Sequence, residues 1–114
     1  MHQVRFGRTG EAYVFDERGY MVTRSRFEPQ SPGDRRGPLV FGRPSVALRT
    51  PTEAPTLAVA SVRRGRTLGM DLDGYVDYRG VVVVGAWHWI EGLGAGVVTE
   101  IDLSEALYAP STLR

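Results

Sequence analysis

The sequence lacks cysteine and lysine and holds only two histidines among its 114 residues. Without cysteine the chain has neither disulfides nor thiol chemistry, and its redox compartment cannot be read from the cysteine count. All 14 basic side chains are arginines, against 13 acidic ones, so the formal net charge is +1. This balance argues against a nucleic-acid partner, because domains that bind phosphates usually carry a basic excess on one face.

Long apolar runs are also missing. The longest apolar run extends from Val81 to Trp87. It is far shorter than the roughly 18 residues that a membrane-spanning helix needs. The first ten residues lack the apolar centre of a signal peptide. A chain of this length holds one core. We therefore expect a single domain over residues 1–114, either a cytoplasmic protein or a piece of a longer chain.

The C-terminal half predicts a meander of three antiparallel strands. Between Met70 and Tyr78 apolar and polar residues alternate, as in a half-buried strand. After a turn at 79–80, residues 81–90 are apolar on both faces, which favours a central strand. A second turn at 91–94 leads to a third strand. Its predicted inward face consists of Ala95, Val97, Thr99 and Ile101.

The N-terminal half predicts shorter strands. Residues 4–6 and 11–15 have strand patterns, and Asp16 to Gly19 forms a hairpin turn that brings back a partner strand at 20–23. Residues from about 28 to 51 contain repeated prolines and glycines, so we expect a long loop insertion with a short strand at 39–41. Such a loop is either functional or an ordinary connection, and both interpretations stay open.

Two helices are predicted. The first covers residues 52–64, with Thr52 as its cap, Gly65 just past its end, and one apolar stripe. That stripe consists of Ala54, Leu57, Ala58 and Val62. The second covers residues 103–109 and ends at Pro110. Asp102 and Glu105 have the spacing of a capping box at its start.

These elements predict an α+β domain with the order ββαβββ. The first strand closes against the last, which makes a five-stranded antiparallel sheet with the helix and the long loop on one face. Only one predicted helix is long enough to cover the sheet, and it can cover only one face. The central strand, however, is apolar on both faces. One sheet face should therefore be exposed, which predicts a homodimer or a missing intramolecular partner.

Candidate chemical motifs are weak. The aspartates around Gly74 lack the spacing of a calcium loop and alternate like a solvated strand face. The glycines at 92–96 precede a strand, whereas a phosphate loop precedes a helix. His88 has no predicted partner for metal binding or acid–base work. We therefore predict no catalytic residues, no metal, no cofactor and no enzymatic activity.

Aromatic side chains suggest a small-molecule pocket. Two tryptophans share one face of the central strand, and tyrosines come from neighbouring strands, so their rings can form apolar walls under the loop. Two arginines are candidate carboxylate anchors. The predicted ligand site consists of Tyr13, Arg24, Arg26, Tyr75, Trp87 and Trp89. The alternative is that the tryptophans simply pack under the helix.

One group of short motifs lies near the start of the chain, with GRTGEAY at 7–13, DERG at 16–19 and SRF at 25–27. This group resembles the opening of the membrane-proximal half of double Cache sensor domains. The closing meander of that half is similar to DYRGV at 77–81, GAWHW at 85–89 and GVVTEID at 96–102. The helix that leads toward the membrane in those domains is similar to SEALYAP at 104–110.

The resemblance implies a PAS-like extracytoplasmic (periplasmic) module of a bacterial inner-membrane receptor with a kinase, cyclase or chemoreceptor output domain. It would sense a small organic ligand or relay a signal, as a homodimer joined to a membrane segment. Asp102 and Glu105 would carry the signal out of the sheet. The alternative is a stand-alone cytoplasmic PAS-like or profilin-like protein that dimerises and binds no ligand.

Overall fold

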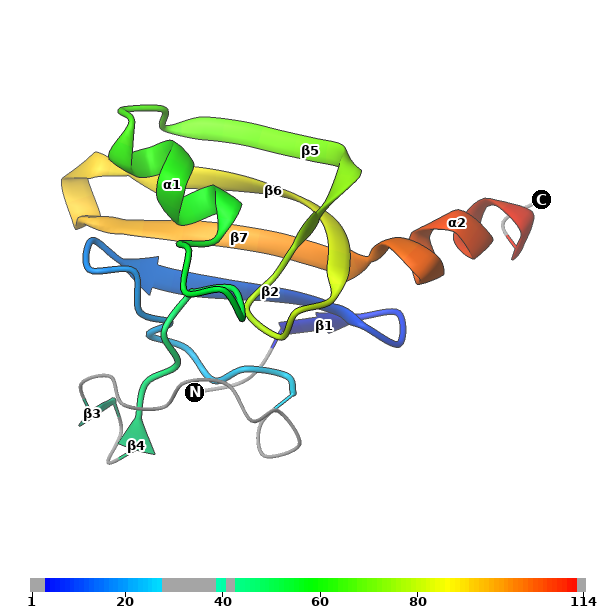
Figure 1. Ribbon diagram of the computed structural model, residues 1–114, viewed down its shortest axis with the longest axis horizontal. Coiled ribbons are helices and arrows are strands. Elements are labelled where there is room, and N and C mark those ends of the chain that lie inside the picture. The colour runs from blue at the N-terminus through cyan, green and yellow to red at the C-terminus, as the bar shows by residue number, and fades with distance from the viewer. Residues whose placement is uncertain (1–3, 28–38, 41–42, 113–114) are drawn as a thin grey trace.

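A five-stranded antiparallel sheet is the main element of the computed structural model, which describes residues 4–27, 39–40 and 43–112 (Figure 1). The strands lie in the order β1-β2-β7-β6-β5. Their bounds are β1 Val4–Phe6, β2 Gly10–Asp16, β5 Leu68–Val76, β6 Val82–Ile90 and β7 Ala95–Asp102. A separate pair is formed by β3 Leu39–Val40 and β4 Arg43–Pro44, and the helices are α1 Leu57–Arg63, a 3₁₀ turn at Glu91–Leu93, and α2 Leu103–Thr112.

The predicted class and the closure of the sheet are confirmed. β5, β6 and β7 follow one another as a meander, and β2 then pairs along the free edge of β7. This pairing runs from Glu11 opposite Glu100 to Asp16 opposite Ala95. β2 and β7 are therefore neighbours inside the sheet, although nearly ninety residues separate Glu11 from Glu100 in the chain.

The predicted partner strand at 20–23 is confirmed only in part, because these residues return antiparallel to β2 but form no strand of the sheet. The edge of β2 that faces away from β7 is shared by β1 and by a short return segment. That segment makes only isolated contacts, with Met21 bridged to Phe15 and the Val22 N–H donating to the Val14 carbonyl at 2.8 Å. It then turns to pair with residues 46–47, so β1 supplies the fifth strand.

Helix α1 begins five residues later than predicted. Pro55 disfavours helical dihedral angles at the residue before it, and Glu53 has a positive φ of 67°. Thr56 therefore takes the position before the first helical residue, and Thr52 does not cap the helix. Three of the four predicted stripe residues, Leu57, Ala58 and Val62, do pack against the core, together with the buried Val59. Ala54 lies outside the helix and is exposed.

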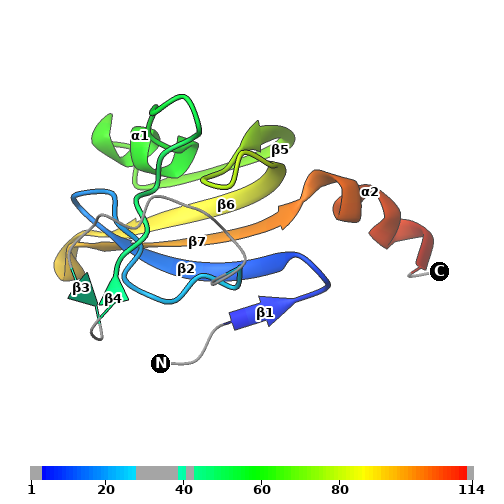
Figure 2. The same cartoon turned by 60° about the horizontal axis from the view of Figure 1, so that its bottom comes forward.

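The core lies between the sheet and α1, which crosses one face of the sheet (Figure 2). It includes Tyr13 and Phe15 from β2, Val98 from β7 and Trp87 from β6. Residues 45–48, at the end of the predicted loop insertion, are buried against the same face. The rest of that insertion falls mainly outside the described residues.

The opposite face of the sheet is exposed, as predicted, but its residues differ from those expected. On β7 the inward side chains are Val98 and Glu100, whereas Val97 is exposed. On β5 the register shifts between Asp71 and Tyr75, and Gly74 there has a φ of 120°. The facing of the side chains is the same on both sides of this irregularity. Asp71 and Tyr75 pair with Gly85 and Val83 on the helix-covered face, whereas Met70 and Val76 are exposed on the open face, so apolar residues occupy that face of β5.

Helix α2 leaves the end of β7 directly and extends beyond the ends of the strands (Figure 2). It continues through Pro110, where we predicted its end. Proline has no N–H to donate to the carbonyl four residues earlier, so the helix passes this position without that hydrogen bond. Within the part of the chain that the structure describes, no helix is long and apolar enough to cross a membrane.

Candidate functional site

Three carboxylates lie in the core of the sheet. Glu11 on β2, Asp77 in the β5–β6 turn and Glu100 on β7 are only 3%, 1% and 3% exposed. Acidic side chains are almost never this buried unless they have partners. Each of the three has them, and the resulting set of carboxylates, tyrosines and one arginine is called the carboxylate network below.

Glu100 is held by two phenols. Tyr13 and Tyr75 donate hydrogen bonds to its carboxylate at 3.0 and 2.6 Å. Burial raises the pKa of Glu100 to about 7, although the two hydrogen bonds oppose the shift. The position opposite is Gly85, where an added Cβ would lie 2.5 Å from the Tyr75 hydroxyl. A glycine there gives Tyr75 room to reach Glu100.

Glu11 is held in a similar way from the other side of the core. It accepts hydrogen bonds from the Tyr78 hydroxyl at 2.7 Å and from the Arg26 backbone N–H at 2.8 Å. The Ser25 and Tyr78 hydroxyls also form a hydrogen bond. Burial raises the pKa of Glu11, while the Tyr78 hydrogen bond lowers it. Burial, followed by the adjacent carboxylate, raises the pKa of Tyr78, so the phenol stays a donor at neutral pH.

Arg79 connects the network to the end of β7. Its guanidinium donates to Asp77 at 2.7 Å and to Asp102 at 2.6 Å, and it lies 3.7 Å from the centre of the Phe27 ring. Asp77 also accepts from the backbone N–H groups of Arg79 and Val81. Asp102 is the last residue of β7, so Arg79 links a buried carboxylate to the point where α2 begins.

Glu105 ties the first turn of α2 to the turn between β1 and β2. Its carboxylate accepts from the backbone N–H groups of Arg8 and Thr9, both at 2.7 Å, and from the Thr9 hydroxyl at 2.6 Å. The Asp102 N–H donates to the same hydroxyl at 3.1 Å. The predicted capping box is therefore wrong, because Glu105 and the Asp102 N–H both find partners on a distant turn. These hydrogen bonds lower the pKa of Glu105.

The structure brings three of the six predicted ligand residues together. Tyr13 and Tyr75 both bind Glu100, and Trp87 packs edge-on against Tyr75 with ring centres 6.0 Å apart. Trp87 belongs to the core cluster that includes α1 residues, and its Nε1 is buried without a partner among the described atoms. Trp89 packs separately, on Phe15.

The two predicted carboxylate anchors lie elsewhere. The Arg26 guanidinium donates to the backbone carbonyls of Gly10 at 2.6 Å, Gly7 at 3.0 Å and Phe6 at 3.1 Å, so it holds the β1–β2 turn. Arg24 is exposed. Two cavities, one beside α1 and one on the open face of the sheet, are lined by residues other than these six. Ligand binding by the six residues stays a prediction.

Sequence reasoning missed the carboxylates at the centre of the network. Asp77 was assigned to a solvated strand face, and Glu11 and Glu100 were given no role. A signal was present for Glu11, because it shares its alternation with the apolar Tyr13 and Phe15. For Asp77 the alternation misleads, since the apolar residues of β5 lie on the open face, and the residues between them, such as Tyr75, face the core.

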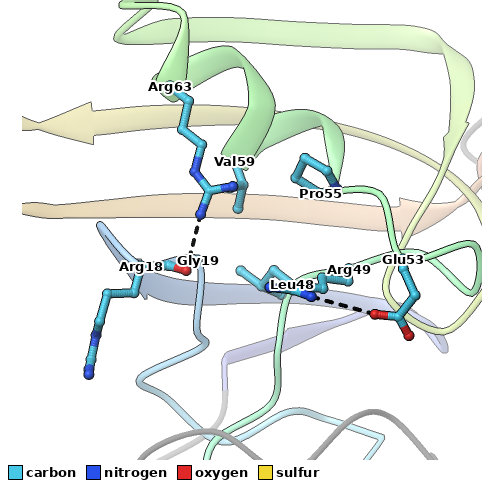
Figure 3. Close-up of a pocket in the computed structure, with 8 residues that line it drawn as sticks. All are labelled: Arg18, Gly19, Leu48, Arg49, Glu53, Pro55, Val59 and Arg63. Carbon is cyan, nitrogen blue, oxygen red and sulfur yellow. Dashed lines mark hydrogen bonds and ion pairs between the residues drawn. The ribbon is translucent and has the colours of Figure 1, made fainter.

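A separate cavity of about 180 Å³ lies between α1 and the turn after β2 (Figure 3). The Arg63 guanidinium donates across it to the Arg18 carbonyl at 3.2 Å, and Arg49 pairs with Glu53 at 3.5 Å. Its floor is formed by apolar groups such as Leu48 and Val59. Because the two arginines already have acceptors, this cavity makes a poor anion site.

Comparisons with protein-family models, with curated proteins and with solved structures found no match to this chain. The resemblance to Cache domains therefore stays an expectation. Among the described residues, no group of three or more histidine, aspartate or glutamate side chains could hold a metal ion. The network is thus interpreted from its own geometry: it links the sheet core to the start of α2.

Proposed function

We propose that this chain is a non-enzymatic, PAS-like sensory or signal-relay module of the Cache type, in the extracytoplasmic part of a bacterial transmembrane receptor. The supporting observation is the double attachment of α2. Arg79 joins Asp102, the residue directly before the helix, to the buried Asp77, and Glu105 joins the first turn of the helix to the β1–β2 turn. A change in either part of the sheet would therefore reach the helix.

The network suits a relay because its three carboxylates, each held by its own hydrogen bonds, act on one another electrostatically: after burial, Asp77 also raises the pKa of both Glu11 and Glu100. Buried polar groups are stable only when all of them are satisfied, so losing one partner disfavours the whole arrangement. Such a cluster tends to occupy discrete arrangements, and a ligand that favours one arrangement shifts the population. In this proposal a small organic ligand binds on the helix-covered face, near the predicted residues, and alters how Tyr75 and Tyr13 hold Glu100.

Hydrogen exchange tests the relay. Tyr75 lies on β5, far from α2 in sequence, and Tyr75→Phe removes one of the two donors to Glu100. The substitution should increase amide exchange in residues 103–109 as well as in β5 and β6. Tyr20→Phe is the control, since Tyr20 contacts Arg18 at the opposite end of β2. Faster exchange confined to β5 and β6, with α2 unchanged, would count against the relay.

A thermal-shift screen with small carboxylates, amino acids and amines tests the sensory part. A compound that binds only the folded chain raises the melting temperature as its concentration rises. A shift abolished by Arg26→Met or Trp87→Phe would support the predicted site. A shift that both variants retain would place the ligand elsewhere.

The second candidate function is a stand-alone cytoplasmic PAS-like or profilin-like protein that acts by dimerising. The exposed apolar face of the sheet favours it. The two candidates differ in the coding sequence downstream of Arg114. A run of about 20 apolar residues there would favour the receptor.

A further inference from the structure

The face of the sheet opposite α1 is apolar across all five strands. Strand pairing puts Ala12, Thr99 and Ala86 side by side on it, and Met70 lies opposite Ala86. Large side chains on this face are well exposed. They are Phe6 (37%), Leu68 (72%), Met70 (67%), Leu72 (68%), Val76 (41%), Val82 (44%) and Val97 (36%). A patch of this kind on a soluble domain usually marks an interaction surface.

The face has both a ridge and a hollow. The ridge is the row of exposed side chains on β5, Leu68, Met70 and Leu72. The hollow, of about 220 Å³, lies beside it over β6 and β7, and its walls are Met70 and Leu72 on one side and Phe6 on the other. Small or short side chains such as Ala86 and Thr99 form its floor. A ridge and a hollow on one face can fit a second copy of that face.

Charge supports a second copy as the occupant. By alternation along β2 and β6, the titratable side chains that share this face are Asp16, at the end of β2, and His88, opposite Leu68. Among the residues that the structure describes, the centre of the face carries no titratable side chain. A charged partner surface would lose its hydration there without gaining an ion pair. An identical apolar face avoids this cost.

The size of the face is also sufficient. Four strands about 4.8 Å apart and about eight residues long, at about 3.4 Å per residue, cover about 500 Å² in projection. The protruding β5 side chains, together with β1 and Phe6, enlarge the accessible area beyond this projection. The total approaches the roughly 800 Å² per partner that a stable interface buries.

We propose that this face binds a second copy of the chain in a two-fold symmetric dimer, with the β5 ridge of each copy seated in the hollow of the other. Such an interface uses the same patch twice and closes on itself. The proposal does not depend on the relay through α2. That relay can be read by hydrogen exchange on a monomeric variant as well, so the two proposals can fail separately.

Sedimentation equilibrium of the full chain at tens of micromolar tests the proposal. The expected mass is that of two 12.6 kDa chains. Leu72→Glu should weaken the dimer about 30-fold or more, because it places a charge in the centre of an apolar interface. Leu93→Glu is the matched control, since Leu93 is 75% exposed in the turn between β6 and β7.

Both leucines are exposed, so neither variant should shift the thermal midpoint of the monomer, and circular dichroism checks that both fold. A monomeric wild-type chain at tens of micromolar would overturn the proposal. So would an oligomer that Leu72→Glu leaves intact. A monomer that floats with phosphatidylcholine vesicles would also overturn it, in favour of a lipid surface.

Discussion

Glu105, in the first turn of α2, accepts hydrogen bonds from both the backbone N–H and the hydroxyl of Thr9, at 2.7 and 2.6 Å. Ninety-six positions separate the two residues. The contact attaches the C-terminal helix to the N-terminal hairpin. An added Cβ at Gly7, which has a φ of 59°, would lie 2.6 Å from the same carboxylate. The β1–β2 turn is thus shaped to receive Glu105.

Replacing Glu105 should loosen α2. In Glu105→Ala the Arg8 and Thr9 N–H groups lose their acceptor, so we expect faster amide exchange at 8–9 and 103–106, with the strands β5 and β6 unchanged. Glu91→Ala, at an exposed position before β7, is the control. Unchanged exchange at both sites would show that the contact contributes nothing to the attachment.

The same contact should weaken in acid. The pKa of Glu105 is lowered in the folded chain, so its stabilising contribution is present above the ordinary value of 4.5 and is lost as pH falls through the lower folded-state pKa. An NMR titration of the Arg8 and Thr9 amides checks this. Their signals should move only below that ordinary value, and a shift at neutral pH would contradict the assignment.

Glu100 should make the free energy of unfolding depend on pH in the opposite sense to Glu105. Its folded pKa of about 7 lies above the ordinary 4.5, so the folded chain holds a proton that the unfolded chain has lost. Stability is then greatest below the unfolded pKa and falls as pH rises through about 7, by up to about 3 kcal/mol. Urea unfolding at several pH values should show this decline, and Glu100→Gln should flatten it. Glu11 has a raised pKa too, so a residual slope of the same sign is expected in that variant.

Gly85→Ala should destabilise the fold. The added methyl group would lie 2.5 Å from both the Thr99 carbonyl and the Tyr75 hydroxyl, so the backbone or Tyr75 must move. We expect a loss of about 1–3 kcal/mol in the free energy of unfolding, as for other overpacked cores. Gly92→Ala is the control, because nothing lies within 4 Å of a Cβ at that position. Equal stabilities of the two variants would mean that the Gly85 site relaxes without cost.

Arg79→Met should be the most damaging of the single changes. The side chain is 13% exposed and neutralises Asp77 (1%) and Asp102 (15%), so its loss leaves two nearly buried charges unpaired. Removing one partner of a buried ion pair typically costs about 3–5 kcal/mol. Arg18→Met removes an exposed partner of Asp16 and should cost less than about 1 kcal/mol. Chemical denaturation measures the free energy of unfolding of both variants. Similar losses of stability in the two would contradict the bridging role of Arg79.

Much of the fold could be predicted from sequence because it rests on local signals. Gly19 and Gly80 mark turns and both have a φ of 84°, and alternating or apolar runs locate β2, β6 and β7. The apolar character of both faces of β6, with one helix to cover them, also predicted the open face. In each case the residues that decide the structure lie within a few positions of one another.

Tertiary structure decided the rest. Alternation alone does not reveal which face of β5 enters the core, because its apolar residues Leu68, Met70 and Leu72 lie exposed on the open face while Tyr75 packs against the core. Nor does it reveal that β1, and not the segment after Gly19, completes the sheet. The partners of Glu100, Glu11 and Glu105 come from strands and turns far away in the chain. A buried carboxylate is acceptable only where such partners converge, and convergence exists only after the sheet has closed.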